Sequence, residues 1–272
     1  MFSLYVMDKE NMVSVMSYDA FKFLLHAAQT FNEAESEGAY RAASSWKVIK
    51  LYYAAYFSAH ATLRLFGKSF NYLEPGHVNF LGERARTEAG FNPRLKSGNY
   101  LASFDFERGD LSFEHFNDSH KDLWRNYSDL LAEMASNSLS LRAPDRRRQE
   151  LSGYFSSMLS ALRHGGSCPL GNWLSVFRNE VNYKSMHGVW YPFPKHAPTI
   201  NHLMSSAKRW RVAEVDCGDP LLSASEVERF FLTCFQVFDL AISISLDLSK
   251  MLDKKDRRIF DFKRMLNESA VA

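Results

Sequence analysis

The chain has 272 residues, 46% of them apolar and 24% charged, with a formal net charge of +2. This composition is ordinary for a soluble globular protein, and so small a net charge leaves any nucleic-acid binding to local clusters of basic residues. No apolar stretch reaches the ~20 residues of a membrane span, and the first residues lack a signal-peptide pattern, so we expect no membrane span and no secretion signal. The three cysteines form no CxxC pair, which argues against a metal site or a disulfide scaffold and is consistent with a cytoplasmic protein.

The first half of the chain predicts two long helices followed by an irregular insertion. Ser17 can cap a helix over residues 18–37, in which apolar residues recur at spacings of three and four. A second helix, opened by one of two serines, is predicted to run to residue 66, where a glycine follows. Residues 67–117 contain scattered Gly, Pro, Asn and aromatic residues without a sustained period. We therefore expect loops and short elements there, with a few helical turns over 78–88.

The second half returns to helical periodicity. The predicted elements, in chain order, are helices over 119–136, 144–164 and 169–186, an extended segment over 189–198, a long helix over 224–252 and a charged tail over 253–272. No internal repeat is visible, and convincing strand alternation is rare. The sequence thus predicts one all-α domain over residues 1–272, a helical bundle with a loop-rich insertion at 67–117 and a long C-terminal helix.

The helix that contains residues 51–67 combines small residues with tyrosines and a histidine. Small residues at helical spacing let another helix approach closely. Tyr56 and His60 are four residues apart and share one helix face. One interpretation is a core helix whose histidine is satisfied by a hydrogen bond; the other places Tyr56 and His60 beside an active groove, as substrate-binding residues. His120 and Trp124 also share a face of a predicted helix, which most simply indicates a buried edge.

A second group of polar residues lies on the helix predicted over 169–186. Its members, in chain order, are Arg178, Asn179, Asn182, Tyr183, Lys184 and His187. Polar groups set into an apolar helix cost free energy unless they are paired or used. One interpretation is that they bond to the ends of neighbouring helices and to loop carbonyls. The other is phosphate recognition, because a guanidinium fork matches phosphate geometry and asparagine adds neutral donors.

The two groups together resemble the HEPN superfamily of small helical bundles, which are found in prokaryotic toxins, antiphage systems and RNA-processing factors. The resemblance covers residues 17–67 and 143–190. The family motif is an arginine, a polar residue, and a histidine in Arg-x4-His spacing. Arg178 and Asn179 match its first two positions, and Tyr183 stands in place of the histidine.

The resemblance implies a metal-independent endoribonuclease or toxin that acts on RNA, with tRNA as one candidate, in a prokaryotic phage-defence or toxin–antitoxin setting. It implies a homodimer, no cofactor, and an antitoxin or another protein of a defence complex as partner. Arg178 would hold the scissile phosphate, Asn179 would orient it, and Tyr183 or His187 would act near the 2′-hydroxyl. Asn182, Lys184, Tyr56 and His60 would bind substrate. Because a phenol is a poor base near neutral pH, a non-catalytic subunit that binds a protein partner is the alternative.

Overall fold

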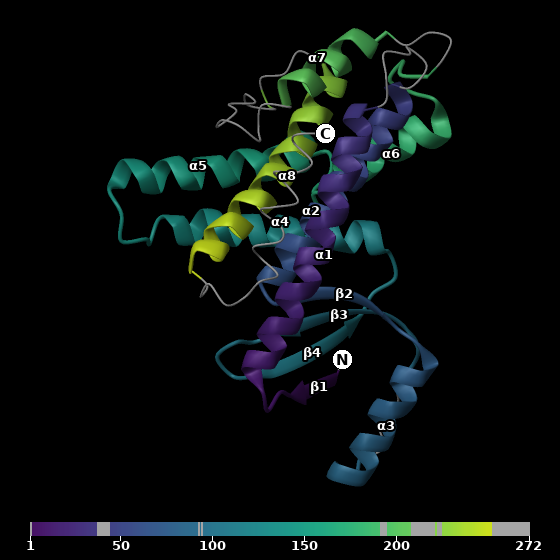
Figure 1. The fold of residues 1–272 in the computed structure, drawn as a ribbon, viewed down its shortest axis with the longest axis vertical. Helices are drawn as coiled ribbons and strands as arrows, with labels where there is room; N and C mark the ends of the chain where they lie inside the picture. The colour runs from purple at the N-terminus through teal and green to yellow at the C-terminus, as the bar shows by residue number, and fades with distance from the viewer. Residues whose placement is uncertain are drawn as a thin grey trace.

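The computed structural model describes residues 2–36, 44–91, 93, 95–190, 195–207, 221 and 225–251. The described chain is mostly helical, as predicted, and it also contains a small antiparallel sheet that the sequence did not reveal (Figure 1). The charged tail expected over 253–272 lies outside the described residues.

Helix α2 lies at the centre of a helical bundle. It spans Ser44–Leu65 and packs against α1 (Lys9–Ser36), α4 (Ser119–Ser138), α6 (Trp173–Lys184) and α8 (Glu226–Met251). Its small residues Ala54, Ala55 and Ala59 are buried, so the neighbouring helices approach closely. Helix α5 (Asp145–Leu162) forms an antiparallel pair with α4, and Figure 1 shows this pair crossing the long axis of the bundle.

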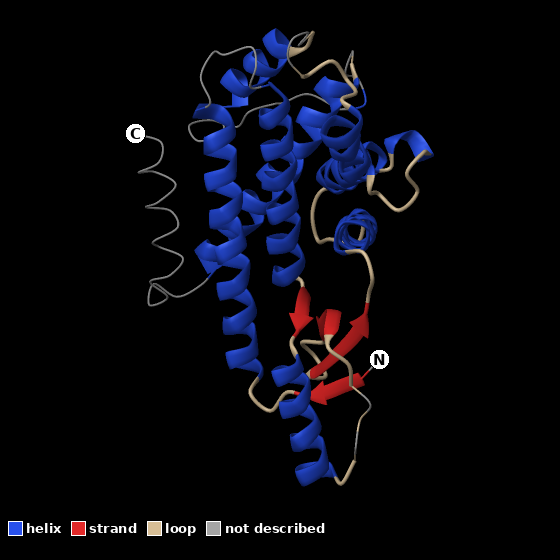
Figure 2. Cartoon of the chain, turned by 90° about the vertical axis from the view of Figure 1, so that its right-hand side faces the viewer, coloured by secondary structure: helices blue, strands red, loops and turns tan. Residues whose placement is uncertain are grey.

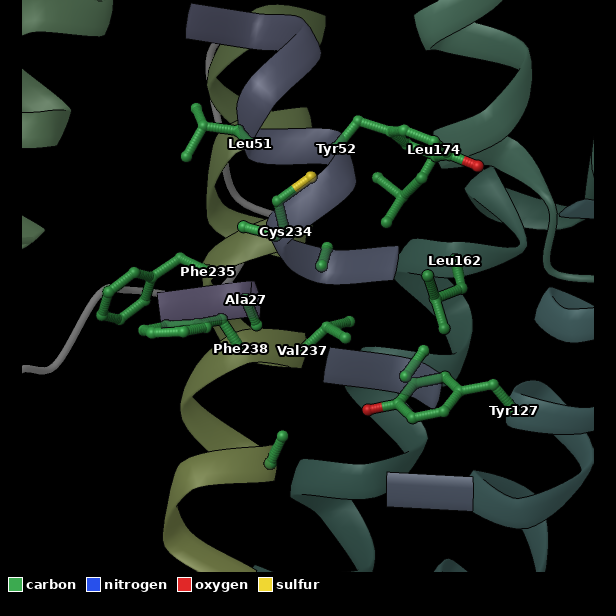
Figure 3. Packing of buried hydrophobic residues seen from close by; sticks show 14 of the residues in the cluster. Ala27, Leu51, Tyr52, Tyr127, Leu162, Leu174, Cys234, Phe235, Val237 and Phe238 are labelled. Atoms are coloured by element: carbon green, nitrogen blue, oxygen red, sulfur yellow. The ribbon is translucent and has the colours of Figure 1, made fainter. Parts of the chain in front are cut away.

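The core of the bundle joins side chains from helices that are far apart in sequence. Figure 3 shows Tyr52 of α2 beside Leu174 of α6, and Phe235 and Phe238 of α8 beside Ala27 of α1. All five side chains are almost completely removed from water. Burial of an aromatic or leucine side chain contributes about 1.5–3 kcal/mol, so this core fixes α6 firmly against α2.

A four-stranded antiparallel sheet lies at one end of the bundle (Figure 2). Its strands are β1 (Phe2–Tyr5), β2 (Lys68–Leu73), β3 (Gly98–Phe104) and β4 (Asp110–His115), in the order β1-β4-β3-β2. Phe70 is paired with Leu101, and both belong to the core shared with the helices. Tyr100, Ala102 and Phe113 form a separate apolar cluster.

The expectation of a loop-rich insertion over 67–117 is wrong, because these residues supply three of the four strands and helix α3 (Pro75–Ala89). The helical turns expected over 78–88 are confirmed within α3. Three consecutive residues of β3, from Tyr100 to Ala102, are buried, so the strand lacks the apolar–polar alternation that would have identified it. Helix α3 extends away from the sheet (Figures 1 and 2), and none of its described residues is buried.

Two helix boundaries and one further helix differ from the prediction. Helix α1 begins at Lys9 rather than after Ser17, and the Asp8 carboxylate caps it by accepting a hydrogen bond from the backbone N–H of Asn11 at 2.9 Å. Helix α6 begins at Trp173, later than expected. Helix α7 (Ala197–Ala207) includes the last two residues of the segment expected to be extended over 189–198, and residues 191–194 of that segment lie outside the described residues.

Helix α8 confirms the predicted long C-terminal helix. The Ser225 hydroxyl accepts a hydrogen bond from the backbone N–H of Glu228 at 3.2 Å, as the sequence pattern predicted. By length and composition, the stretch Glu226–Lys250 could cross a membrane, but 56% of its most apolar window is buried inside the structure. Helix α8 packs against α2, α5 and α7, so it is part of the core of the bundle.

Candidate functional site

Helix α6 carries Arg178 into the interior of the bundle. Trp173, Leu174, Phe177 and Val181 form the buried face of α6, at the spacings of one helical stripe. Arg178 follows Phe177 directly and points toward α2, where its side chain is only 7% exposed. The apolar stripe of α6 therefore dictates that this guanidinium is buried.

The guanidinium of Arg178 is surrounded by neutral partners. It donates from Nη1 to Oδ1 of Asn179 at 2.7 Å and from Nη2 to Nε2 of His120 at 3.2 Å. Its central carbon lies 4.9 Å from the ring centre of Tyr52 and 5.7 Å from that of Tyr53. Nε is buried and has no hydrogen-bond partner. Within the described part of the chain no carboxylate forms an ion pair with this cation, which is the unusual feature of the site.

The hydrogen bonds around His120 fix its tautomer. A guanidinium can only donate, so Nε2 of His120 must accept, and the ring proton lies on Nδ1. Nδ1 lies 2.7 Å from the hydroxyl oxygen of Tyr52, to which it donates. The same oxygen accepts from Nε1 of Trp124 at 3.3 Å, and burial raises the pKa of Tyr52 to about 12, so this phenol stays protonated. His120 is thus a neutral imidazole with Nε2 directed at Arg178.

Electrostatics also favour a neutral His120. Partial burial lowers the pKa of His120, the positive charge of Arg178 lowers it further, and the Asp118 carboxylate opposes these effects more weakly. A neutral imidazole can accept a proton, and a guanidinium beside it can stabilise negative charge. The pair has the two chemical capacities that metal-independent phosphodiester cleavage requires.

Tyr56 and His60 extend this site along α2. The ring centre of Tyr56 lies 4.6 Å from that of His120 and 4.7 Å from that of His60. Nδ1 of His60 accepts from Nη1 of Arg64 at 3.0 Å, and burial lowers the pKa of Arg64 to about 10. The structure therefore brings these two predicted substrate-binding residues close to Arg178 through His120, although His60 is itself buried.

The buried imidazole of His60 makes folding sensitive to acid. Burial, followed by the charge of Arg64, lowers the pKa of His60 well below its ordinary value. The unfolded chain therefore binds a proton near pH 6.5 that the folded chain does not, and stability falls as the pH drops below 6.5. We expect urea denaturation to show that His60 accounts for a loss of about 1 kcal/mol between pH 7.5 and 5.5. His60→Asn, which keeps an acceptor for Arg64, should lose correspondingly less stability; an identical loss would contradict this assignment.

The structure does not gather the remaining predicted residues of α6 around Arg178. Tyr183 is 74% exposed, and Asn182 and Lys184 are exposed as well. Asn179 is exposed but keeps its contact with Arg178. Tyr183 therefore does not stand beside the guanidinium in the way that the Arg-x4-His spacing predicted.

His187 also lies away from Arg178, in contact with α8. Helix α6 ends at Lys184, and His187 adopts a left-handed backbone with φ of 66°. Its Nε2 lies 3.0 Å from Oε2 of Glu180, and its Nδ1 lies 3.4 Å from Oε2 of Glu226. Its ring stacks on Phe177 with 4.0 Å between ring centres. This residue therefore links the end of α6 to the beginning of α8, which is a structural role.

Replacing His187 with alanine is expected to destabilise the fold by about 2 kcal/mol, because the change removes a stacked ring, a hydrogen bond to Glu180 and a polar contact with Glu226. The side chain is only 9% exposed, so water does not replace these contacts. Lys184→Ala is the matched control, since its exposed ion pair with Glu180 is worth less than about 1 kcal/mol. Equal urea midpoints for the two variants would exclude a linking role for His187.

His120 was not among the residues predicted for the site. His120 and Trp124 share one face of α4, as predicted, but this face is not simply a buried edge. Trp124 is fully buried, whereas His120 is half-buried and reaches Arg178. Among the described residues, no group of three or more His, Cys, Asp or Glu is arranged to hold a metal ion.

The resemblance of two segments to the HEPN superfamily stays a prediction. Comparisons of the chain with protein-family models, curated proteins and solved structures found no significant match.

Proposed function

We propose that the chain binds RNA at the Arg178–His120 pair and cleaves it without a metal ion. The observation that carries this proposal is the 3.2 Å contact between Nη2 of Arg178 and Nε2 of a neutral His120, at a guanidinium that lacks a carboxylate partner among the described residues. A buried cation without an acidic partner is suited to an anionic ligand, and the phosphodiester of RNA is an anion that a guanidinium fork matches.

In this proposal His120 takes the role that the linear motif assigned to Tyr183 or His187. Nε2 of His120 accepts the proton of the 2′-hydroxyl, and the 2′-oxygen forms a bond to phosphorus. The bond from phosphorus to the 5′-oxygen breaks, and the 5′-oxygen takes a proton from water. Arg178 stabilises the charge on the phosphate oxygens. The products are a 2′,3′-cyclic phosphate and a 5′-hydroxyl.

The setting proposed for this activity follows the HEPN resemblance. It is a cytoplasmic toxin or phage-defence nuclease that acts on tRNA or another cellular RNA. Asn182, Tyr183 and Lys184 form an exposed polar surface at the end of α6. This surface is suited to binding RNA, a second copy in a homodimer, or an antitoxin.

The test is cleavage of bulk cellular RNA and tRNA in EDTA by wild type and by Arg178→Ala. We expect wild type alone to cleave and to leave 2′,3′-cyclic phosphate ends. Arg86→Ala, an exposed arginine on α3, is the control for nonspecific loss of positive charge. Cleavage that persists in Arg178→Ala at the wild-type rate would refute the proposal.

A non-catalytic subunit is the second candidate, and the hydrogen bonds inside the site favour it. An unbroken series of hydrogen bonds joins Arg178 to His120, His120 to Tyr52, and Tyr52 to Trp124. Such a network can have a purely structural role, in which it holds α2, α4 and α6 together. Absence of cleavage by the folded wild type, combined with a large loss of stability in Arg178→Ala, would support this candidate.

A further inference from the structure

Both groups that the proposed reaction needs are occupied by each other. Nε2 of His120, the atom that would accept the 2′-hydroxyl proton, already accepts a hydrogen bond from Nη2 of Arg178. The lone pair of a neutral imidazole nitrogen serves one donor at a time. His120 cannot act as a base while this bond persists, so the structure corresponds to a resting state of the proposed site.

The contacts of Arg178 show which of its bonds is weakest. Nη1 donates to Asn179 over 2.7 Å, which is a short bond for a guanidinium. Nη2 donates to His120 over 3.2 Å, at the long end of the usual range. Nε is buried and has no partner. The edge formed by Nε and Nη2 is therefore the side of the guanidinium that is incompletely bonded, and two parallel donors on one edge are what a phosphate accepts in bidentate fashion.

We infer that a phosphate group displaces His120 from the Nε–Nη2 edge of Arg178, and that this exchange frees Nε2 of His120 to act as the base. The inference rests on the proposed function, and it explains how substrate binding would switch the site from its resting state to an active one. A charged acceptor forms stronger hydrogen bonds to a guanidinium than a neutral imidazole does, so the exchange is favourable for an oxyanion.

Tyr52 is the positioning residue in this exchange. Nδ1 of His120 donates to the hydroxyl oxygen of Tyr52 over 2.7 Å, and that oxygen is held in turn by Nε1 of Trp124. Tyr52 is completely buried, so it does not move with the ligand. When the bond to Arg178 is lost, the bond to Tyr52 keeps the imidazole attached to α2 and keeps its proton on Nδ1. Nε2 then remains unprotonated and directed at the bound phosphate.

The charged and titratable groups that face His120 determine how its pKa responds to a bound phosphate. They are Arg178 on α6, Tyr52, Tyr56 and His60 on α2, and Asp118 at the beginning of α4. Burial lowers the pKa of His120, and the positive charge of Arg178 lowers it further. A bound phosphate neutralises that charge, so occupancy of the site should be visible in the titration of this one imidazole.

The experiment follows the ring nitrogens of His120 by NMR in full-length wild-type protein, with and without inorganic phosphate or a 2′-deoxy dinucleoside monophosphate. The deoxy probe carries the phosphodiester but lacks the attacking hydroxyl. We expect either probe to raise the apparent pKa of His120 by about one pH unit. Sodium chloride at equal ionic strength is the control, and His115, an exposed residue of β4, is the internal reference.

Two variants make the result specific to the exchange. In Arg178→Ala the apparent pKa of His120 should already be raised, and phosphate should no longer change it. In Tyr52→Phe, phosphate should still raise the apparent pKa of His120. The ring proton of the neutral imidazole should then be distributed between Nδ1 and Nε2, which nitrogen chemical shifts report directly. A purely structural role for Tyr52 would leave the tautomer unchanged and would refute its assignment.

The outcomes separate this inference from the proposed function. If neither probe changes the apparent pKa of His120, in a protein whose RNA cleavage depends on Arg178, the exchange is refuted and the nuclease proposal is left intact. A titration that responds to phosphate through Arg178, in a protein that cleaves no RNA, would support an anion-exchange site and refute the nuclease proposal.

Discussion

Replacing His120 with glutamine is expected to slow RNA cleavage by about 10²–10⁴-fold, which is the usual contribution of a general base. Glutamine can still accept a hydrogen bond from Arg178, so the guanidinium keeps a partner and the fold should be retained. It cannot take up a proton near neutral pH. The measurement is single-turnover cleavage of a labelled RNA, with thermal unfolding of the same samples to verify folding.

His115→Gln is the matched control, because His115 is an exposed histidine of β4 and lies outside the site. It should cleave at the wild-type rate. For wild type, the lowered pKa of His120 places the acid limb of kcat/KM below pH 6.5, since the rate falls where the imidazole becomes protonated. Full activity in His120→Gln, or an acid limb that the substitution leaves in place, would exclude His120 as the base.

The helical part of the fold could be predicted because its signals are local. Apolar periodicity defined α2 and α8, and a serine capping pattern located the beginning of α8. The sheet could not be predicted in the same way. β1 has four residues that are mostly exposed, and β3 is buried on consecutive positions, so neither strand shows alternation. The pairing of β1 with β4 joins residues 2–5 to 110–113, a contact between distant segments that no local pattern encodes.

Arg178 could be identified from the sequence because a guanidinium in an apolar helix stripe is costly unless it is used. Its partner could not be identified, since His120 and Tyr52 reach it only through the packing of three helices. Tyr183 lies within α6 but on its exposed side, away from the guanidinium. Helix α6 ends at Lys184, and the left-handed backbone of Ser185 turns the chain so that His187 contacts α8 and not Arg178.

Gly171, two residues before α6, is where the chain that leads to Arg178 lies close against α4, the helix that carries His120. Gly171 is buried and adopts a φ of +71°. A Cβ atom at this position would lie 1.7 Å from Oγ of Ser128 and 2.9 Å from its Cβ, both on α4. We expect Gly171→Ala to destabilise the protein by about 2–5 kcal/mol, the sum of left-handed backbone strain and overpacking.

Two further variants separate the components of this loss in urea denaturation. Gly165→Ala has a similar φ of +62° and open space around its Cβ, so it should cost only the backbone component of about 1–2 kcal/mol. Ser128→Ala removes the closest clashing atom, Oγ of Ser128, which is buried without a hydrogen-bond partner. Added to Gly171→Ala, it should restore part of the lost stability. Equal losses in Gly171→Ala and Gly165→Ala would show that the helices can separate at no cost. Because separation would lengthen the contact between His120 and Arg178, Gly171→Ala should also lose activity under conditions in which it remains folded.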